Sequence, residues 1–172
     1  QRPDPDSGRA AFASDGEKVT LEAIARAAGV GIGTLYRHFP TREALVEAVY
    51  RDQLGRLCDS AAKLLADHEP DAALRAWMDR FSDYVATKRD MADTLRAIIA
   101  SGAVTKTQAR SQLSEAVQTL LDAGAAAGTL RTDVQAEDVV VSLVGVFLAC
   151  GQPDQRAQAG RILDLLIAGL RA

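Results

Sequence analysis

The sequence has few of the residues that mark several common classes of protein. There are only two cysteines, Cys58 and Cys150, and two histidines, His38 and His68, in separate segments of a chain of 172 residues. We therefore expect neither a disulfide framework nor a metal site, and no cofactor. A membrane span needs roughly 18 uninterrupted apolar residues. The longest candidate, 139–150, contains a serine and a glycine, so we expect no membrane partner and a reduced, cytoplasmic protein.

Charge of a single sign is also missing. Lys and Arg number 20 and Asp and Glu 23, which gives a net charge of -3 and a pI of about 5.4. This balance excludes a basic coat over the whole chain for nucleic acid or membrane binding. Any contact with nucleic acid must therefore be local.

The sequence also lacks the strings that mark common catalytic sites. Neither a Gly-x-Ser-x-Gly nor a His-Glu-x-x-His string occurs, and Cys58 has no histidine near it in sequence. Gly29, Gly31 and Gly33 superficially suggest a phosphate-binding loop, but no strand precedes them and the dinucleotide spacing is incomplete. We do not expect an enzyme.

What the chain does have is helical periodicity. Apolar residues recur three and four positions apart almost throughout, and strand-like alternation is nearly absent, so we predict an all-α fold. Thr41 and Asp71 are predicted N-caps, and Gly29 and Gly128 are predicted to end helices. The expected helices are 9–14, 21–28, 31–38, 42–66, 71–88, 91–100, 105–127, 136–150 and 155–171. Short helices give way to long ones near residue 50, which predicts domains at 1–50 and 51–172.

Residues 20–39 have the pattern of a helix-turn-helix. Ile24 and Leu35 would pack inward, and Gly29 would form the turn. The second helix would face outward with Ile32, Gly33, Thr34, Tyr36, Arg37 and His38. Arg26, Arg37 and Arg42 are the only charged residues between 26 and 42, so this segment is locally cationic in an acidic chain. The pattern favours a DNA-binding helix, although any two amphipathic helices around a glycine turn share it.

Residues 33–45 favour a DNA-binding helix-turn-helix over an ordinary pair of amphipathic helices. The run Gly-Thr-Leu-Tyr-Arg-His-Phe, followed by Pro-Thr-Arg-Glu-Ala-Leu, resembles the signature of the TetR (tetracycline-repressor-like) family of bacterial regulators. The resemblance implies an N-terminal three-helix DNA-binding domain and a larger helical bundle for effector binding and dimerisation. Residues 121–138 resemble the SbtR-like C-terminal domain of that family. The predicted DNA-binding residues are Thr20, Gly31, Ile32, Gly33, Thr34, Tyr36, Arg37, His38 and Arg42.

Three departures from the family pattern stand out. Gly31 stands where the family often has serine, and Ile32 where lysine or arginine is frequent, so the operator cannot be inferred from relatives. Residues 1–8 are polar and contain two prolines, so they cannot continue a helix in front of Arg9. We therefore expect the first helix to be truncated or incomplete.

Two further sets of residues are assigned from the family's use of its C-terminal bundle. The alternative for both sets is ordinary core packing. The predicted effector-binding residues, which indicate a mainly apolar ligand, are Leu57, Cys58, Trp77, Met78, Phe81, Tyr84, Leu95, Ile98, Ile99, Val117, Leu121 and Phe147. The predicted dimer-interface residues are Val140, Leu143, Val144, Leu148, Ile162, Leu165, Leu166 and Gly169.

Together these features predict a homodimeric, ligand-responsive transcriptional regulator. Its partners would be a palindromic double-stranded DNA operator and an unknown small-molecule effector that releases it, and the family suggests a repressor. The alternative is a helical ligand-binding or protein-interaction module that has lost DNA binding, which the incomplete first helix would favour.

Overall fold

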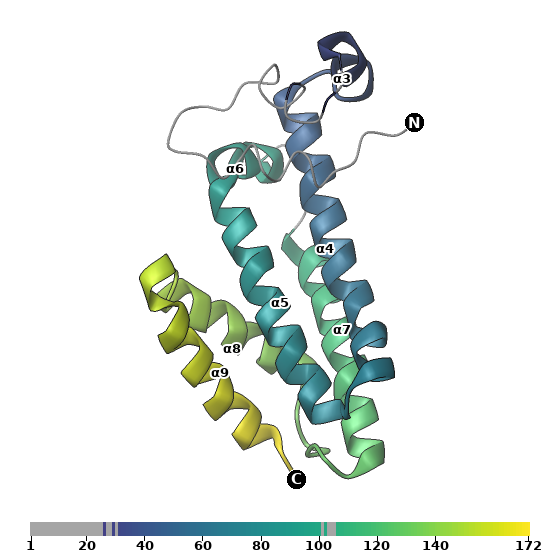
Figure 1. The fold of residues 1–172 in the computed structure, drawn as a ribbon, viewed down its shortest axis with the longest axis vertical. Coiled ribbons are helices and arrows are strands. Elements are labelled where there is room, and N and C mark those ends of the chain that lie inside the picture. The colour runs from purple at the N-terminus through teal and green to yellow at the C-terminus, as the bar shows by residue number, and fades with distance from the viewer. Residues whose placement is uncertain (1–25, 27–28, 30, 101, 103–105) are drawn as a thin grey trace. The chain divides into compact units, whose positions relative to one another are not determined.

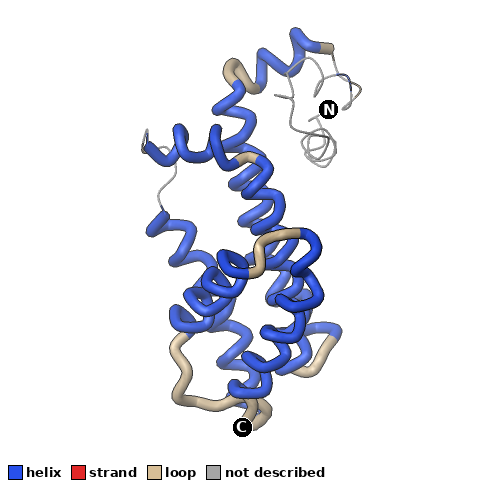
Figure 2. The backbone as a smooth tube through the Cα atoms, turned by 90° about the vertical axis from the view of Figure 1, so that its left-hand side faces the viewer, coloured by secondary structure: helices blue, strands red, loops and turns tan. Residues whose placement is uncertain are grey.

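The computed structural model describes residues 26, 29, 31–100, 102 and 106–172 (Figure 1). These residues form helices joined by short loops and one isolated bridge, between Leu130 and Arg171, so the all-α prediction is confirmed (Figure 2). The helices are α3 (Ile32–His38), α4 (Arg42–Asp67), α5 (Pro70–Asp90), α6 (Ala92–Ala100), α7 (Lys106–Ala127), α8 (Ala136–Ala149), the 3-10 turn η1 (Pro153–Gln155) and α9 (Arg156–Leu170). The predicted helix 9–14, nearly all of 21–28, and Thr20 and Ile24 lie outside the described residues.

The helix ends follow local side-chain and backbone chemistry. The Ala44 amide donates to Thr41 Oγ1 at 3.1 Å, which confirms the predicted cap of α4. Gly29 and Gly128 have φ of 65° and 69°, a conformation that glycine adopts without steric cost. The predicted cap at Asp71 is wrong, because α5 already begins at Pro70 and Asp71 is its second residue. Proline suits the first helical position, where no amide hydrogen bond is required.

The chain divides into two compact units. The first contains the described residues up to Gln53 together with those between Thr87 and Thr105, and the second contains Leu54–Ala86 and Lys106–Ala172. α4 and α5 are continuous helices that contribute residues to both units. The division into a DNA-binding domain at 1–50 and an effector-binding and dimerisation domain at 51–172 stays a prediction.

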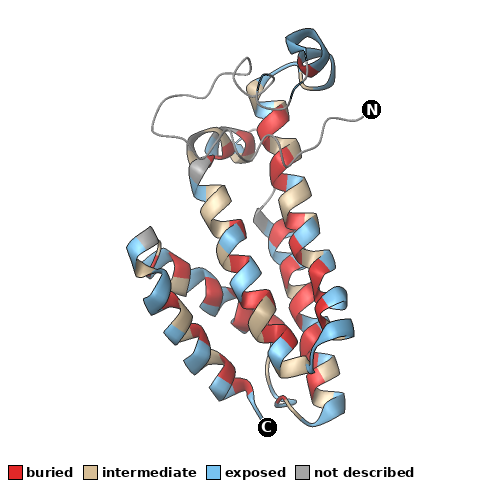
Figure 3. Cartoon of the chain, in the orientation of Figure 1, coloured by how far each residue is buried: buried red, intermediate tan, exposed pale blue. Residues whose placement is uncertain are grey.

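The core of the second unit is centred on α5, which carries many buried residues (Figure 3). Leu74, Trp77, Met78 and Phe81 are fully buried. The Trp77 indole Nε1 donates to the carbonyl of Leu57 on α4 at 3.0 Å, so its one polar group is satisfied. The rings of Phe81 and Phe147, on α8, lie 5.8 Å apart between centroids. α4, α5 and α8 thus share one apolar core.

The end of α7 is joined to the C-terminal segment of the chain. At the end of α7, the Gly128 amide donates to the carbonyl of Ala125 at 3.1 Å and the Thr129 amide to that of Gly124 at 2.9 Å, which closes a Schellman-type turn. Leu130 lies directly on Gly124, where an added β-carbon would be only 2.3 Å from Leu130 Cδ1. The Arg131 amide then donates to the carbonyl of Leu170 at 2.9 Å. Gly124 therefore permits the close approach that fixes this loop.

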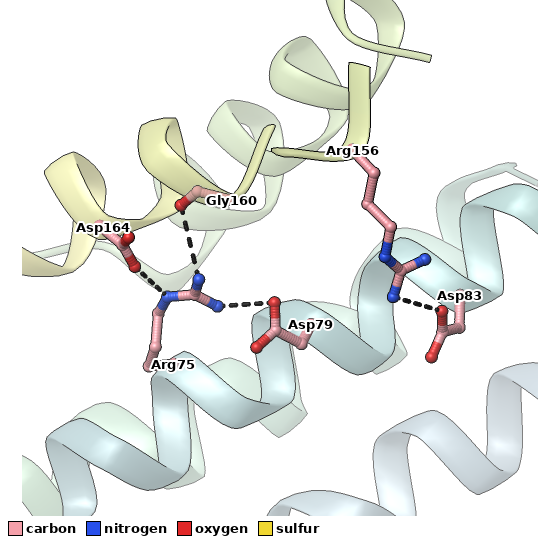
Figure 4. A network of polar contacts seen from close by, with 6 residues as sticks. All are labelled: Arg75, Asp79, Asp83, Arg156, Gly160 and Asp164. Atoms are coloured by element: carbon pink, nitrogen blue, oxygen red, sulfur yellow. Dashed lines mark hydrogen bonds and ion pairs between the residues drawn. The ribbon is translucent and has the colours of Figure 1, made fainter. Parts of the chain in front are cut away.

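A charged network connects α5 with α9 (Figure 4). Arg75 Nε lies 2.7 Å from Asp164 Oδ1, and its Nη1 lies 2.7 Å from Asp79 Oδ1. Hydrogen bonds to these two carboxylates raise the pKa of Arg75 above its ordinary value, although burial acts in the opposite direction. Arg156 at the start of α9 reaches Asp83 at 3.1 Å. These pairs fix the position of α9 on α5.

Candidate nucleic-acid interface and associated surfaces

The predicted recognition helix is α3. Leu35 is its buried residue and Phe39 follows it half-buried. Gly31 precedes the helix in extended conformation, with φ -65° and ψ 140°, and its carbonyl accepts from the amides of Thr34 and Leu35 at 2.9 and 3.1 Å. The Phe39 amide donates to Leu35 at 2.8 Å, which closes the helix. One buried leucine therefore orients the helix.

The rest of α3 faces solvent, as its spacing predicted. Ile32 and Tyr36 are 38% and 43% exposed, and Gly33, Thr34, Arg37 and His38 are also exposed. Arg37 occupies the last turn of α3, where its positive charge interacts favourably with the helix dipole. This face combines hydrogen-bonding groups with a cation, a combination suited to base edges and phosphates.

Arg42 differs from the other two arginines of the cationic segment. Arg26 and Arg37 are exposed, whereas Arg42, the first residue of α4, is half-buried. Its Nε donates to Thr94 Oγ1 on α6 at 3.4 Å, within the first unit. In the same unit, the Lys88 ammonium lies 5.9 Å from the centroid of the Tyr50 ring. The start of α4 is thus tied to α6, a contact between residues 52 positions apart that the sequence did not reveal.

The predicted effector-binding residues fall in both units. Leu95, Ile98 and Ile99 lie on α6 in the first unit. The remaining nine belong to the second unit, where Cys58 is half-buried and the others are buried. Those eight buried residues are Leu57, Trp77, Met78, Phe81, Tyr84, Val117, Leu121 and Phe147. The eight buried residues form part of the apolar core described above. Effector binding by the whole set stays a prediction.

Cys58 is the one member of this set with reactive chemistry. Its thiol donates to the carbonyl of Gln112 on α7 at 3.5 Å. Burial raises the pKa of Cys58 from 9.0 to about 11, with smaller contributions from Asp59 and Glu115. Since the thiolate is the nucleophile, this raised pKa disfavours reaction of Cys58 at neutral pH.

The predicted dimer-interface residues differ sharply in exposure. Val140 and Leu143 on α8 are buried within the chain itself, so they have no surface to offer a second chain. Leu148 and Leu165, by contrast, are 81% and 74% exposed. Val144 and Gly169 are also exposed, whereas Ile162 and Leu166 are half-buried. Sequence reasoning missed exposed Val141, although its spacing to Val144 and Leu148 could have revealed it.

We define the α8 stripe as the exposed residues Val141, Val144, Gly145 and Leu148. They lie three, four and seven positions apart and therefore share one side of the helix. A β-carbon added at Gly145 would meet no atom within 4 Å, so packing inside the chain does not require glycine there. α9 packs against α8 and adds Leu165 and Gly169 to the exposed surface.

Two family models match the chain. The model described as bacterial regulatory proteins, tetR family, matches residues 6–49. The model described as transcriptional regulator SbtR-like, C-terminal domain, matches residues 69–172, which is more than half of the chain. The chain therefore belongs to the TetR family of transcriptional regulators, and its C-terminal domain is of the SbtR-like type.

Solved structures agree with this assignment. The chain is 50% identical to the TetR transcriptional regulator SCO0520 from Streptomyces coelicolor, with a TM-score of 0.88 over 97% of this chain and 95% of that one. It is 31% identical to a TetR regulatory protein from Mycobacterium vanbaalenii, with a TM-score of 0.74 over 98% and 92%. A search of curated proteins gave no match.

None of the helices in the described part of the chain combines the length and apolarity that crossing a bilayer requires. Within the same residues, His, Cys, Asp and Glu form no group of three or more that could hold a metal ion.

Proposed function

We propose that the protein is a homodimeric repressor that binds a palindromic DNA operator through α3 and releases it when a small apolar effector binds the C-terminal bundle. The observation that carries this proposal is the exposed face of α3, held by buried Leu35 in a chain of the TetR family. Family membership makes DNA binding and ligand response typical, and the exposed groups supply the chemistry.

Each exposed group of α3 has a role that its chemistry supports. Arg37 can donate two parallel hydrogen bonds to the O6 and N7 atoms of guanine in the major groove. Thr34 can bond a base edge, while Tyr36 and His38 can reach phosphates. The guanidinium of Arg42 has five N–H donors in a planar fork, a geometry suited to a phosphate. Arg37 would then read sequence and Arg42 would provide position.

The α8 stripe supports dimerisation. Several exposed large apolar side chains on adjoining helices mark an interaction surface more often than a solvated one. Gly145 sits within the stripe without an internal packing reason, and glycine inside a helix costs about 1 kcal/mol relative to alanine. A second copy approaching closely at this point gives that glycine a purpose. In a two-fold dimer the same stripe would serve both partners.

The path of the chain supports ligand response as part of the proposal. α4 and α5 each run from one compact unit into the other, so a shift of either helix in the second unit reaches the first through a continuous backbone. In the first unit, the bond from Arg42 to Thr94 ties the start of α4 to α6. An effector that binds the released state more tightly by about 5.5 kcal/mol could move the population from 1:99 to 99:1.

The proposal is tested by selecting duplexes from a random pool with the purified full-length protein at moderate salt. We expect an inverted repeat whose half-site centres are about 34 Å apart, or a multiple of that distance. A pool without any enriched inverted repeat would contradict the proposal. Tight small-molecule binding by the same preparation would then favour the module that has lost DNA binding.

A further inference from the structure

The first turn of α3 presents one large side chain, and that side chain is apolar. Ile32 is 38% exposed, although it is followed closely by the buried Leu35. The residues on either side of it are Gly31 and Gly33, which have no side chains to cover it. Ile32 is therefore the dominant group at the beginning of the proposed recognition helix.

Packing inside the described chain does not account for the flanking glycines. A β-carbon added at Gly33 would meet no atom within 4 Å, and one added at Gly31 would meet only Thr34 Oγ1, at 3.9 Å. Gly31 has φ -65°, a value open to any residue. Glycine and β-branched isoleucine are also poorer helix formers than alanine or leucine. Neither internal packing nor helix stability therefore explains the sequence Gly31-Ile32-Gly33. The two glycines leave room for another molecule to approach Ile32.

Ile32 lies within the proposed DNA-facing surface. Tyr36 is four residues further along α3 and is also exposed, so the two side chains share one side of the helix. Close approach of DNA to this side would bury Ile32. Isoleucine has neither a donor nor an acceptor, so it cannot satisfy a polar base edge there.

The chemistry of the major groove limits which group of the DNA can make a favourable contact with Ile32. Base edges in that groove carry hydrogen-bond donors and acceptors, and the 5-methyl group of thymine is the apolar group among them. We propose that Ile32 is a specificity-determining residue that contacts the 5-methyl group of a thymine in each operator half-site. This inference rests on the proposed function and adds a feature of the operator that the proposed function does not specify, a thymine methyl group in each half-site.

The test removes the methyl group from DNA. The probe is the most enriched duplex from the random pool, in which each thymine is replaced in turn by deoxyuridine, symmetrically in both half-sites. Deoxyuridine keeps base pairing and lacks only the methyl group. Loss of one buried methyl should weaken binding roughly fourfold, and the symmetric pair roughly tenfold or more. We expect this loss for wild-type protein at one half-site position assigned to Ile32.

Variants identify the residue that senses the methyl group. Ile32→Ala should bind the thymine and deoxyuridine duplexes equally at that position, whereas Ile32→Val should keep most of the difference. Thr34→Ala is the matched control, because Thr34 carries the other methyl group in this part of α3. It should keep the wild-type ratio even if its overall affinity falls. Thermal melting of each full-length variant verifies that it is folded.

Three results would overturn the inference. The selected half-site could contain no thymine, wild-type protein could bind every deoxyuridine duplex as tightly as the parent, or Ile32→Ala could keep the wild-type sensitivity. Each result leaves specific binding of the parent duplex intact. Failure of the proposed function itself would appear earlier, as the absence of an enriched inverted repeat.

Discussion

Two helices of this chain expose different sets of side chains: α3 adds polar and cationic groups to Ile32 and Tyr36, whereas the α8 stripe is apolar. α3 exposes Thr34, Arg37 and His38, whereas α8 exposes Val141, Val144 and Leu148. Hydrogen-bonding and cationic groups suit a wet, charged partner such as DNA. Clustered apolar groups suit burial against another apolar surface. The comparison shows that exposure alone does not define a site, and that the chemistry of the exposed side chains separates the two proposed partners.

α8 also shows why its own sequence looks apolar all round. Val140, Leu143 and Phe147 form one stripe that is buried in the core. The exposed stripe has the same spacing, shifted by one residue. A helix with two apolar sides needs cover on both. The chain itself covers one side, and the proposed second copy covers the other.

The largest expected effect comes from Leu148→Glu. Leu148 is 81% exposed, so the free chain should fold normally, while an unpaired carboxylate buried between two copies would weaken the dimer by about 3 kcal/mol or more. Sedimentation velocity over a concentration series should show mainly monomer. Ala62→Glu places the same charge at an exposed residue of α4 and should leave the association unchanged. Equal association of the two variants would break the contrast between α8 and the other surfaces.

The next effect separates two kinds of DNA contact. Arg37→Ala should lose about 1–3 kcal/mol on the preferred sequence and relax the preference at one base pair. Arg42→Ala should weaken all sequences alike and reduce the salt slope by about one. Binding titrations at several salt concentrations, on the selected duplex and on single-position variants, measure both quantities. The same loss of sequence preference in both variants would contradict the assignment.

Gly33→Ala tests whether DNA approaches α3 closely at Gly33. The free protein has space for the methyl group, so alanine should stabilise the helix by up to about 1 kcal/mol. DNA affinity should nevertheless fall, because the methyl group would hold the helix away from the groove. Gly160→Ala is the matched control on α9, where an added β-carbon also has open space. If both variants bind DNA as tightly as wild type, Gly33 is not needed for close approach.

The smallest effects concern the network that holds α9 on α5. Arg75 has a side chain only 23% exposed and contacts two carboxylates, so Arg75→Ala should lower the free energy of unfolding by about 1 kcal/mol. Arg156 and Asp83 are more exposed, and Arg156→Ala should cost less than about 0.5 kcal/mol. Urea unfolding measures both changes. The reverse order would show that Arg156, rather than Arg75, fixes the position of α9.

Local signals in the sequence were enough to predict most of the described fold. Gly29 has positive φ and Thr41 caps α4, as predicted. Both features are local: glycine adopts positive φ without steric cost, and the threonine hydroxyl accepts from an amide three residues away. Leu35 is buried and Arg37 exposed for an equally local reason, their spacing on α3. The DNA-facing surface could therefore be predicted as an exposed surface, while its contacts with DNA stay a proposal.

Other features depend on contacts between distant residues, and periodicity does not reveal them. Arg75 and Asp164 are 89 positions apart, and Arg42 and Thr94 are 52 apart. The sequence left both an interface and core packing open for Val140 and Leu143, and the structure buries them in the core. Two equally apolar stripes on one helix look alike in sequence, and the packing of α5, α7 and α9 against α8 distinguishes the inner from the outer one.

In the proposed function, two copies joined through α8 and α9 hold two α3 helices in fixed register on DNA. The most direct measurement is the affinity of wild-type protein for the selected inverted repeat and for the same duplex with five base pairs inserted between its half-sites. Five base pairs are about half a helical turn, so the insertion turns the half-sites to opposite faces of the duplex. We predict that binding falls to the level of a duplex with a single half-site. Unchanged affinity for the lengthened duplex would contradict the account.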